Sequence, residues 1–271
     1  MTCLAGVIGD PIAQSRSPRL HGHWLRRYEI DGHYVPLHVT RDMLSQTLET
    51  LPKLGFQGLN VTIPHKEAVF RLANDVTERA RSVEAANTLT FRDGRILADN
   101  TDGIGFIANL RQQAPVWQVN APALVLGAGG AARGIVAALL NEGVPRVTIV
   151  NRTAARAQTL ADLFDRRVRT MPWEMASPAL ADHGLLVNTT SLGMTGQPPL
   201  VLDLSALHAD TTVSDIVYTP LMTPLLKDAQ DRGATVVEGL GMLLHQAVPG
   251  FTEWFGVVPD VDDELRAAVL A

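Results

Sequence analysis

The sequence contains a single cysteine among 271 residues, which excludes an internal disulfide and a zinc site built from several cysteines. No apolar run approaches the roughly 18 residues that a membrane-spanning helix needs. The first residues lack the basic start and apolar stretch of a secretory signal. Like charges form no long block and the formal net charge is −5, so no nucleic-acid partner is expected. These absences predict a soluble, cytoplasmic protein that binds neither membrane nor nucleic acid.

The eight histidines are the remaining candidates for metal ligands. His21 and His23 stand two residues apart in a stretch with helical spacing, so their side chains would point to different faces of a helix. No cysteine partners them with the spacing of a zinc site. We therefore expect no catalytic metal.

Short apolar runs rich in β-branched residues alternate with helical patterns along most of the chain. The predicted strands are residues 7–8, 58–64, 123–126, 146–150, 185–187 and 213–217. Strands that alternate with helices are typical of parallel βαβ units, so the sequence predicts an α/β fold. Ser17 and Pro18 resemble a helix N-cap followed by proline at the first helical position.

The pattern places a domain boundary near residue 104. A helix predicted over 103–110 leads out of the first α/β region, and a second series of strands and helices follows. The end of the chain, residues 240–271, is helical in pattern and is expected to return to the first domain, because domain termini often lie close together. The predicted domains are residues 1–104, rejoined by 240–271, and residues 105–239.

The second region opens on the sequence GAGGAA from Gly127, which matches the dinucleotide pattern G-x-G-x-x-A. It directly follows a predicted strand and opens a helix predicted over 131–140. Glycines permit a tight turn and a close approach to a pyrophosphate, and the helix N-terminus offers free N–H groups. The alternative is a glycine turn without a ligand, but the order of strand, loop and helix favours a dinucleotide site. The pyrophosphate would lie against Gly127, Ala128, Gly129, Gly130 and Ala131.

The end of the next predicted strand indicates which dinucleotide binds. Asn151 stands 24 residues after Gly127, where an NAD-binding protein is expected to carry a carboxylate for the ribose 2′-hydroxyl. The sequence here is Asn151-Arg152-Thr153, with Arg156 one helical turn further on. Two guanidinium groups suit a 2′-phosphate, since each can donate paired N–H bonds to it. A solvated surface arginine is the alternative, and the pattern favours NADP.

The first region carries polar runs of its own. Ser15 and Ser17 stand beside a predicted helix start, which suits a small carboxylate, although an N-cap role for Ser17 explains the pattern equally well. Residues 98–103 form another polar run, and an Asx turn that caps a helix is the alternative interpretation there.

A further polar run lies at residues 60–66. Asn60 and Thr62 share one face of a predicted strand, because side chains alternate along a strand. Lys66 follows the end of that strand, which is where α/β proteins place groups that bind ligands.

Together and in this order, the motifs resemble those of the shikimate dehydrogenase family. They are VIGDPIAQSRSP from Val7, NVTIPHK from Asn60, AANTL from Ala85, DNTDG from Asp99, GAGGAA from Gly127, NRTAAR from Asn151, NTTSLGM from Asn188 and GLGMLLHQA from Gly239. The motifs span nearly the whole chain, and several in the right order are far more specific than any one of them.

The resemblance implies an oxidoreductase that reversibly reduces 3-dehydroshikimate to shikimate with NADPH, in the chorismate pathway to the aromatic amino acids. It implies an N-terminal α/β substrate domain and a Rossmann-type NADP-binding domain, with the active-site cleft between them. The implied partners are a small-molecule substrate and NADP, and the enzyme would be a monomer or a homodimer.

The resemblance also implies roles for individual residues. Lys66 and Asp102 would form the catalytic pair, and Tyr218 would help the two serines to hold the substrate carboxylate. The implied substrate contacts are Ser15, Ser17, Asn60, Thr62, Asn87, Tyr218 and Gln246. The implied cofactor contacts are Gly127, Ala128, Gly129, Gly130, Ala131, Asn151, Arg152, Thr153, Arg156, Ile216 and Gly239.

The chemistry explains why such a reaction needs a lysine and a carboxylate. A hydride that arrives at a ketone carbon builds negative charge on the oxygen, which needs a proton and electrostatic stabilisation. A lysine ammonium supplies both, and a nearby carboxylate orients it and favours its charged form. The sequence leaves open whether Lys66 donates the proton or mainly positions the substrate.

Two alternatives stay open from the sequence. A quinate/shikimate dehydrogenase would accept an extra ring hydroxyl and often NAD, but Arg152 argues against NAD, and relatives that use quinate tend to carry threonine in place of Ser17. A non-catalytic protein that responds to NADP would have no need of Lys66 and Asp102.

Overall fold

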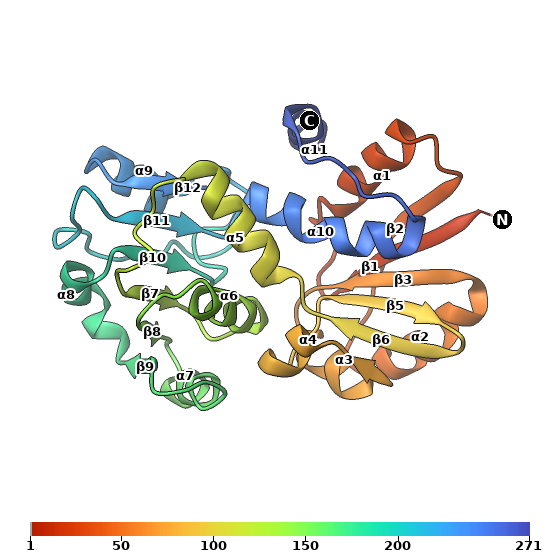
Figure 1. Ribbon diagram of the computed structural model, residues 1–271, viewed down its shortest axis with the longest axis horizontal. Helices are drawn as coiled ribbons and strands as arrows, with labels where there is room; N and C mark the ends of the chain where they lie inside the picture. The colour runs from red at the N-terminus through yellow and green to blue at the C-terminus, as the bar shows by residue number, and fades with distance from the viewer. Residues whose placement is uncertain (1) are drawn as a thin grey trace. The chain divides into compact units, whose positions relative to one another are not determined.

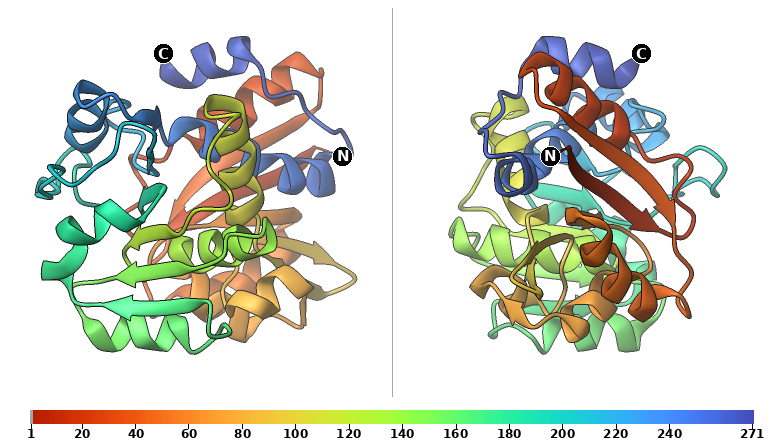
Figure 2. Two further views of the ribbon diagram at one scale, coloured as in Figure 1. Left: turned by 60° about the vertical axis from the view of Figure 1, so that its left-hand side comes forward. Right: turned by 90° about the vertical axis from the view of Figure 1, so that its right-hand side faces the viewer.

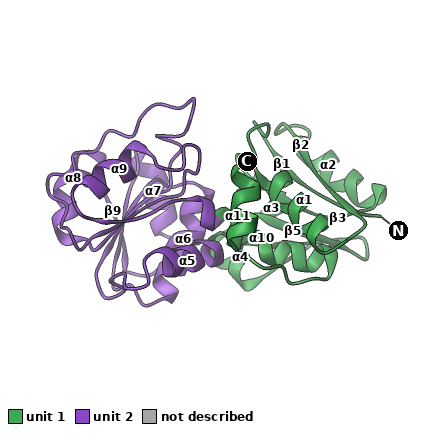
Figure 3. Cartoon of the chain, turned by 90° about the horizontal axis from the view of Figure 1, so that it is seen from above, with its two compact units in different colours: residues 1–102, 243–271 green, residues 103–242 purple. Residues whose placement is uncertain are grey.

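The computed structural model describes residues 2–271, and Figures 1 and 2 trace the chain from its red N-terminal part to its blue C-terminal part. The chain forms two compact units, which Figure 3 distinguishes by colour. Unit 1 comprises residues 2–102 together with Leu243–Ala271, and unit 2 comprises Gly103–Met242. The roles that the sequence assigns to residues 1–104 and 105–239 stay predictions.

Unit 1 is built on a sheet of six strands in the order β2-β1-β3-β5-β6-β4. They are β1 (Cys3–Gly9), β2 (Gly32–His38), β3 (Phe56–Val61), β4 (Asp75–Val76), β5 (Thr88–Arg92) and β6 (Arg95–Asp99). The sheet is mixed rather than parallel, because β5 runs antiparallel to both of its neighbours, β3 and β6. Asp93 and Gly94 connect β5 to β6 with φ of 52° and 70°, a left-handed conformation that suits a tight hairpin turn.

Helices from both ends of the chain pack on the sheet of unit 1. They are α1 (Ser17–Arg27), α2 (Leu44–Thr50), α3 (Lys66–Leu72), α4 (Glu78–Val83), α11 (Asp263–Leu270) and, from Leu243 onward, α10 (Leu240–Phe255). Trp254 on α10 donates from Nε1 to the carbonyl of Leu89 at 3.0 Å. Gly58 on β3 lies so close to Trp254 that a Cβ there would overlap the indole ring. The C-terminal segment is thus a packed part of unit 1, and α11 lies beside α1 (Figure 2).

The core of unit 1 has two parts. Aliphatic side chains of the central strands, among them Ile8, Leu59 and Leu89, form a buried cluster with residues of α2, α3 and α4. An aromatic cluster between α1 and α10 contains His21, whose ring stacks on Tyr34 with 3.9 Å between the ring centroids. Burial of these side chains is the main favourable contribution to the folding of the unit.

Unit 2 is built on a sheet of six parallel strands in the order β12-β11-β10-β7-β8-β9, as expected for a Rossmann-type domain (Figure 1). They are β7 (Ala123–Leu126), β8 (Val147–Val150), β9 (Val168–Met171), β10 (Leu185–Asn188), β11 (Thr212–Asp215) and β12 (Thr235–Val237). Every residue of β7, β8, β10 and β11 is buried. This burial explains why these strands appear in the sequence as continuous apolar runs, since helices cover both faces of a parallel sheet.

The helices of unit 2 alternate with its strands. They are α5 (Asp102–Gln113), which begins at the last residue of unit 1, α6 (Gly130–Asn141), α7 (Ala154–Ala161), α8 (Ala176–Ala179) and α9 (Pro224–Asp231), with short 3-10 turns η2 (Trp173–Met175) and η3 (Leu180–Asp182). Gly103 on α5 packs against the backbone of Gly134 on α6, where a Cβ would lie 2.6 Å from the carbonyl oxygen. The prediction of strands separated by helices is confirmed for unit 2.

Several element ends differ from the prediction. The strand predicted over 58–64 ends at Val61, where the chain turns toward α3, and the strand predicted over 213–217 ends at Asp215. Helix α1 begins at Ser17 and its N-cap is Arg16, so the prediction that Ser17 is the N-cap is wrong by one residue. Within residues 2–271, no helix has the length and apolar character to cross a membrane.

Candidate active site

The polar groups that the sequence singled out in unit 1 gather where strands end and helices begin. Asn60 lies on β3, Thr62 follows the end of that strand, and Lys66 is the first residue of α3. Asp102 follows β6 and is the first residue of α5. The ends of strands are where α/β proteins bind ligands, because loops and helix N-termini converge there.

Lys66 and Asp102 form a hydrogen-bonded ion pair. Lys66 Nζ donates to Asp102 Oδ2 at 2.6 Å, and the two side chains are 12% and 5% exposed. The residues are far apart in sequence, so the fold brings them together. A charged pair with so little access to water needs further hydrogen bonds to offset its desolvation.

Asn87 supplies that support. Its Nδ2 lies 2.9 Å from Asp102 Oδ1, 3.0 Å from Gln246 Oε1 and 3.0 Å from Thr101 Oγ1. Its Oδ1 accepts from the backbone N–H of Thr101 at 2.8 Å. An amide carries two N–H donors, so Asn87 can serve two of its three acceptors at one time. The buried Asn87 therefore holds both the carboxylate of the ion pair and the side chain of Gln246.

Asn60 is held in a second buried network. Tyr34 donates from its hydroxyl to Asn60 Oδ1 at 2.7 Å, and Asn60 Nδ2 donates to the carbonyl of Asn87 at 3.3 Å. Burial raises the pKa of Tyr34 well above its ordinary value, so the hydroxyl keeps its proton and acts as a donor. Burial likewise lowers the pKa of the adjacent His21 to about 3, which keeps that ring neutral.

The start of α1 carries the two serines. Ser15 Oγ accepts from the backbone N–H of Ser17 at 3.3 Å, so Ser15 supplies the side-chain hydrogen bond at this helix start. Ser17 is buried and makes no capping bond. The structure thus argues against the capping explanation for Ser17 and leaves the carboxylate hypothesis in place.

In unit 2, the glycines of the dinucleotide pattern have the shape that close approach requires. Gly127 has φ of +108°, and a Cβ on it would lie 2.5 Å from Thr189 Oγ1. Gly129, the N-cap of α6, would direct a Cβ into open space. Helix α6 begins at Gly130 with no side-chain cap, so its first N–H groups remain available to an anion. These features fit a pyrophosphate.

The residues after β8 fit a phosphate. Arg152 and Arg156 are exposed, and neither side chain forms a hydrogen bond or ion pair with another residue in the described part of the chain. Asn151 Nδ2 donates to the carbonyl of Thr153 at 2.9 Å and so shapes the turn before α7. The turn carries no carboxylate, in agreement with the preference for NADP that the sequence indicates.

Ile216 and Gly239 lie against each other in unit 2. A Cβ on Gly239 would lie 2.5 Å from the carbonyl carbon of Ile216, so only glycine allows this approach. The buried Asp215 accepts from the backbone N–H of Val217 at 3.0 Å and from Thr223 Oγ1 at 2.8 Å. Burial raises the pKa of Asp215 to about 6. Asp215 therefore fixes both ends of the loop that carries Tyr218.

Three family models match separate parts of the chain. Residues 7–89 match the shikimate dehydrogenase substrate binding domain, residues 111–194 match shikimate / quinate 5-dehydrogenase, and residues 239–269 match the shikimate 5′-dehydrogenase C-terminal domain. A relative from Jannaschia sp. (strain CCS1), named shikimate dehydrogenase (NADP(+)), is 59% identical over 270 residues, which cover 99% of this chain and 97% of the relative. The chain belongs to the shikimate dehydrogenase family.

Solved structures agree with this membership. Shikimate 5-dehydrogenase from Thermus thermophilus, solved with NADP(H) and shikimate, has a TM-score of 0.88 and 34% identity and covers 100% of this chain and 99% of its own. Quinate dehydrogenase from Corynebacterium glutamicum, solved with NAD, has a TM-score of 0.92 and 31% identity and covers 99% of both chains. The family and fold predicted from the motifs are confirmed.

Two residues that support the site of this shikimate dehydrogenase family member, Thr101 and Tyr34, were not predicted from the sequence. Thr101 stands within the DNTDG motif, and its position between two acidic residues was a usable signal. No local sequence pattern predicts the role of Tyr34, because its contact with Asn60 joins two strands.

Tyr218 lies in unit 2, and its contact with substrate stays a prediction. Among the described residues, no three histidine, cysteine, aspartate or glutamate side chains gather in a way that could hold a metal ion.

Proposed function

We propose that this protein catalyses the reversible, NADP-dependent reduction of 3-dehydroshikimate to shikimate. The observation that carries the proposal is the enclosed pair of Lys66 and Asp102, 2.6 Å apart and held by Asn87, in a chain of this family. A protein that only bound the ligands would gain nothing from enclosing a lysine and a carboxylate at such a cost in desolvation.

Lys66 acts on the oxygen of the substrate ketone. Its ammonium stabilises the negative charge that develops there and donates a proton to it. Asp102 Oδ2 orients the ammonium, while Asn87 restrains the other oxygen of the same carboxylate. The network fixes the acid before the substrate arrives, so little reorganisation accompanies the reaction.

The remaining polar groups of unit 1 bind and orient the substrate. The two serines at the start of α1 hold the carboxylate, with help from Tyr218, because hydroxyl groups donate to an anion without adding a charge. The amides and the threonine that line the strand ends bind the ring hydroxyls. These residues are Asn60, Thr62, Asn87 and Gln246.

The residues of unit 2 fit the cofactor. NADPH, when bound, supplies the hydride. Residues 127–131 hold the pyrophosphate on the open N-terminus of α6, and Gly129 leaves the space it needs. Arg152 and Arg156, together with Asn151 and Thr153, hold the phosphate of the adenosine. Ile216 and Gly239 contact the nicotinamide.

A four-way assay tests the proposal. Purified protein is mixed with shikimate or quinate, each with NADP or NAD, and the absorbance of the reduced nicotinamide is followed. We expect turnover with shikimate and NADP alone. Comparable turnover with quinate or NAD would assign the protein to a dual-specificity branch, and NADP binding without turnover would contradict the enzymatic role.

Two further properties remain proposals. The enzyme is a monomer or a homodimer in solution, which sedimentation equilibrium distinguishes by mass. It acts in the cytoplasm, which cell fractionation followed by the shikimate assay tests.

A further inference from the structure

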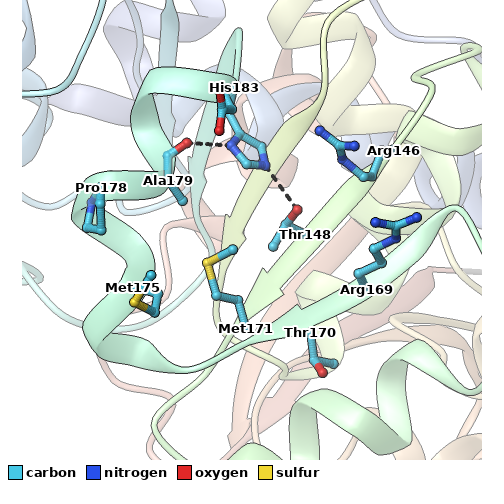
Figure 4. Close-up of a pocket in the computed structure, with 10 residues that line it drawn as sticks. Arg146, Thr148, Arg169, Thr170, Met171, Met175, Pro178, Ala179 and His183 are labelled. Carbon is cyan, nitrogen blue, oxygen red and sulfur yellow. Dashed lines mark hydrogen bonds between the residues drawn. The ribbon is translucent and has the colours of Figure 1, made fainter.

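A cavity in unit 2 is lined by none of the residues assigned to the cofactor. It has a volume of about 390 Å³, and Figure 4 shows the side chains around it. One part of the lining comes from β8, the residue before it and β9, and consists of Arg146, Thr148, Arg169, Thr170 and Met171. The other part comes from the segment around α8 and η3 and includes Asp182 and His183.

The register of the sheet explains why two arginines share the first part of this lining. Thr148 on β8 pairs with Arg169 on β9, so both side chains lie on the same face of the sheet. Arg146 stands two residues before Thr148 and therefore lies on that face as well. Both guanidinium groups lie on the same side of the cavity in Figure 4.

Arg146 and Arg169, like Arg152 and Arg156 and unlike several other arginines of unit 2, have no acidic partner among the described residues. Arg111, Arg167 and Arg232 each pair with a carboxylate. Arg146 and Arg169 form no side-chain hydrogen bond or ion pair with any residue from 2 to 271. Two neighbouring positive charges that form no ion pair favour a doubly charged anion.

Thr148 and His183 form a polar, uncharged part of the lining. His183 Nδ1 donates to the carbonyl of Ala179 at 2.6 Å, so its Nε2 accepts from the hydroxyl of Thr148 at 2.9 Å. Burial lowers the pKa of His183, and the nearby Arg146 lowers it further, which keeps the ring neutral. Thr170 and Asp182 are further polar residues of the lining, and its apolar residues are Met171, Met175, Pro178 and Ala179.

The geometry of the sheet separates Arg146 from the residues that follow β8, although the cavity lining extends along β9 to Met171. Arg146 precedes β8, whereas Asn151 follows it. In a parallel sheet the starts of the strands lie at one edge and their carboxyl ends at the other, and four residues of strand span about 13 Å. Strand β8 thus has an unpartnered arginine pair at each end.

We propose that this cavity binds a small organic phosphate. The phosphoryl group lies between the guanidinium groups of Arg146 and Arg169, each of which can donate two parallel N–H bonds to it. A small apolar body lies against Met171 and Met175. Asp182, the acidic residue of the lining, limits the affinity by repulsion.

Calorimetric titration with phenyl phosphate tests the proposal, with the protein saturated with NADP so that the cofactor site is filled. We expect binding of one equivalent, and an affinity at least about tenfold lower in Arg146→Gln and in Arg169→Gln, because each loses a charge-assisted pair of bonds. Arg166→Gln is the matched control, since it removes an exposed positive charge just before β9. It should change the affinity less than twofold.

Two further titrations distinguish binding at this site from non-specific attraction of anions. Asp182→Asn should bind phenyl phosphate several-fold more tightly, because a repulsive charge is removed. Inorganic phosphate and phenol, which each carry one half of the probe, should bind at least about tenfold more weakly than phenyl phosphate. Absence of binding at millimolar concentration, equal affinity in Arg146→Gln, or equal binding of phenol would overturn the proposal. Neither arginine is buried, so the variants should fold, which their thermal unfolding checks.

Discussion

The two units differ in how the charged side chains of their candidate sites are partnered. In unit 1 the charges of the site are enclosed, and their partners belong to the protein: Lys66 pairs with Asp102, and Asn87 binds the same carboxylate. In unit 2 the arginines at both ends of β8 are unpartnered within the described chain. The comparison indicates that unit 1 is organised before its ligand arrives, whereas unit 2 relies on the ligand to supply the counter-charge.

The largest expected effect is on the enclosed pair. Lys66→Ala removes the group that we propose as proton donor, and we expect kcat to fall at least about a hundredfold, which is the usual lower scale for a general acid. Steady-state assays with shikimate and NADP measure it. Lys53→Ala, an exposed lysine of the same unit, is the matched control and should keep the parent kcat. A near-normal kcat in Lys66→Ala would remove the lysine from the mechanism.

Two glycine variants are expected to have the next largest effects. Together they distinguish a loss of stability from a loss of cofactor binding in unit 2. Gly127→Ala places a Cβ against Thr189 at a positive φ, and we expect a loss of about 2 kcal/mol in the free energy of unfolding. Gly129→Ala directs its Cβ into open space, so its stability should stay within about 0.5 kcal/mol of the parent.

The two variants should differ in the opposite order in their affinity for NADP. Gly129→Ala fills the space assigned to the pyrophosphate, so its Kd for NADP should rise about tenfold or more, as measured by fluorescence titration. Stability that falls equally in both variants would show that Gly129 is needed for folding instead.

The arginines after β8 give a smaller, selective effect. Arg152→Gln should raise the Kd for NADP about tenfold and leave the Kd for NAD nearly unchanged, because NAD lacks the 2′-phosphate that the guanidinium would bind. Arg166→Gln again serves as the control for loss of charge. Equal losses for the two dinucleotides would mean that Arg152 contacts another part of the cofactor.

The last predicted effects are on the pH dependence of stability, and they concern two buried groups, one in each unit, whose pKa values shift in opposite directions. The pKa of His21 is about 3 in the folded protein against 6.5 when unfolded, so the unfolded state binds more protons and unit 1 loses stability as the pH falls from about 6.5. The pKa of Asp215 is raised from 3.8 to about 6, so its contribution is full below about 3.8 and is lost as the pH rises through about 6.

Urea unfolding between about pH 4 and 6 tests this opposition. In the parent, His21 makes the free energy of unfolding rise with pH by up to roughly 1.4 kcal/mol per pH unit, and His21→Phe should abolish this dependence. Asp215→Asn should abolish a dependence of opposite sign. Trp24 and Trp254 report on unit 1, and Trp117 and Trp173 report on unit 2. Identical pH profiles in parent and variants would mean that neither group changes its pKa on folding.

The contrast between the units also explains what the sequence could predict. In unit 2 the decisive contacts are local: strand, glycine turn and helix follow one another from Ala123 to Asn141, and the strands are apolar because both faces of the sheet are covered. Both the parallel sheet and the position of the glycine pattern were therefore accessible from short stretches of sequence.

Unit 1 was harder because its arrangement depends on long-range contacts. The antiparallel strand β5 was missed, although Asp93-Gly94 between two β-rich runs is a strong hairpin signal. The contact between Tyr34 and Asn60 and the one between Asn87 and Gln246 join distant parts of the chain, and no spacing rule gives them. The pairing of Lys66 with Asp102 came from family resemblance rather than from any local pattern.

The hydrogen bonds of Gln246 have a consequence for the order in which the protein is made. Gln246 comes from the last 29 residues of the chain, Leu243–Ala271, yet its backbone carbonyl accepts from Thr101 and its side chain from Asn87. When residue 242 has been synthesised, the chain therefore contains all of unit 2 and only part of unit 1. Because domains fold as units during synthesis, unit 2 can fold before Gln246, which shares Asn87 with the carboxylate of Asp102, has been synthesised.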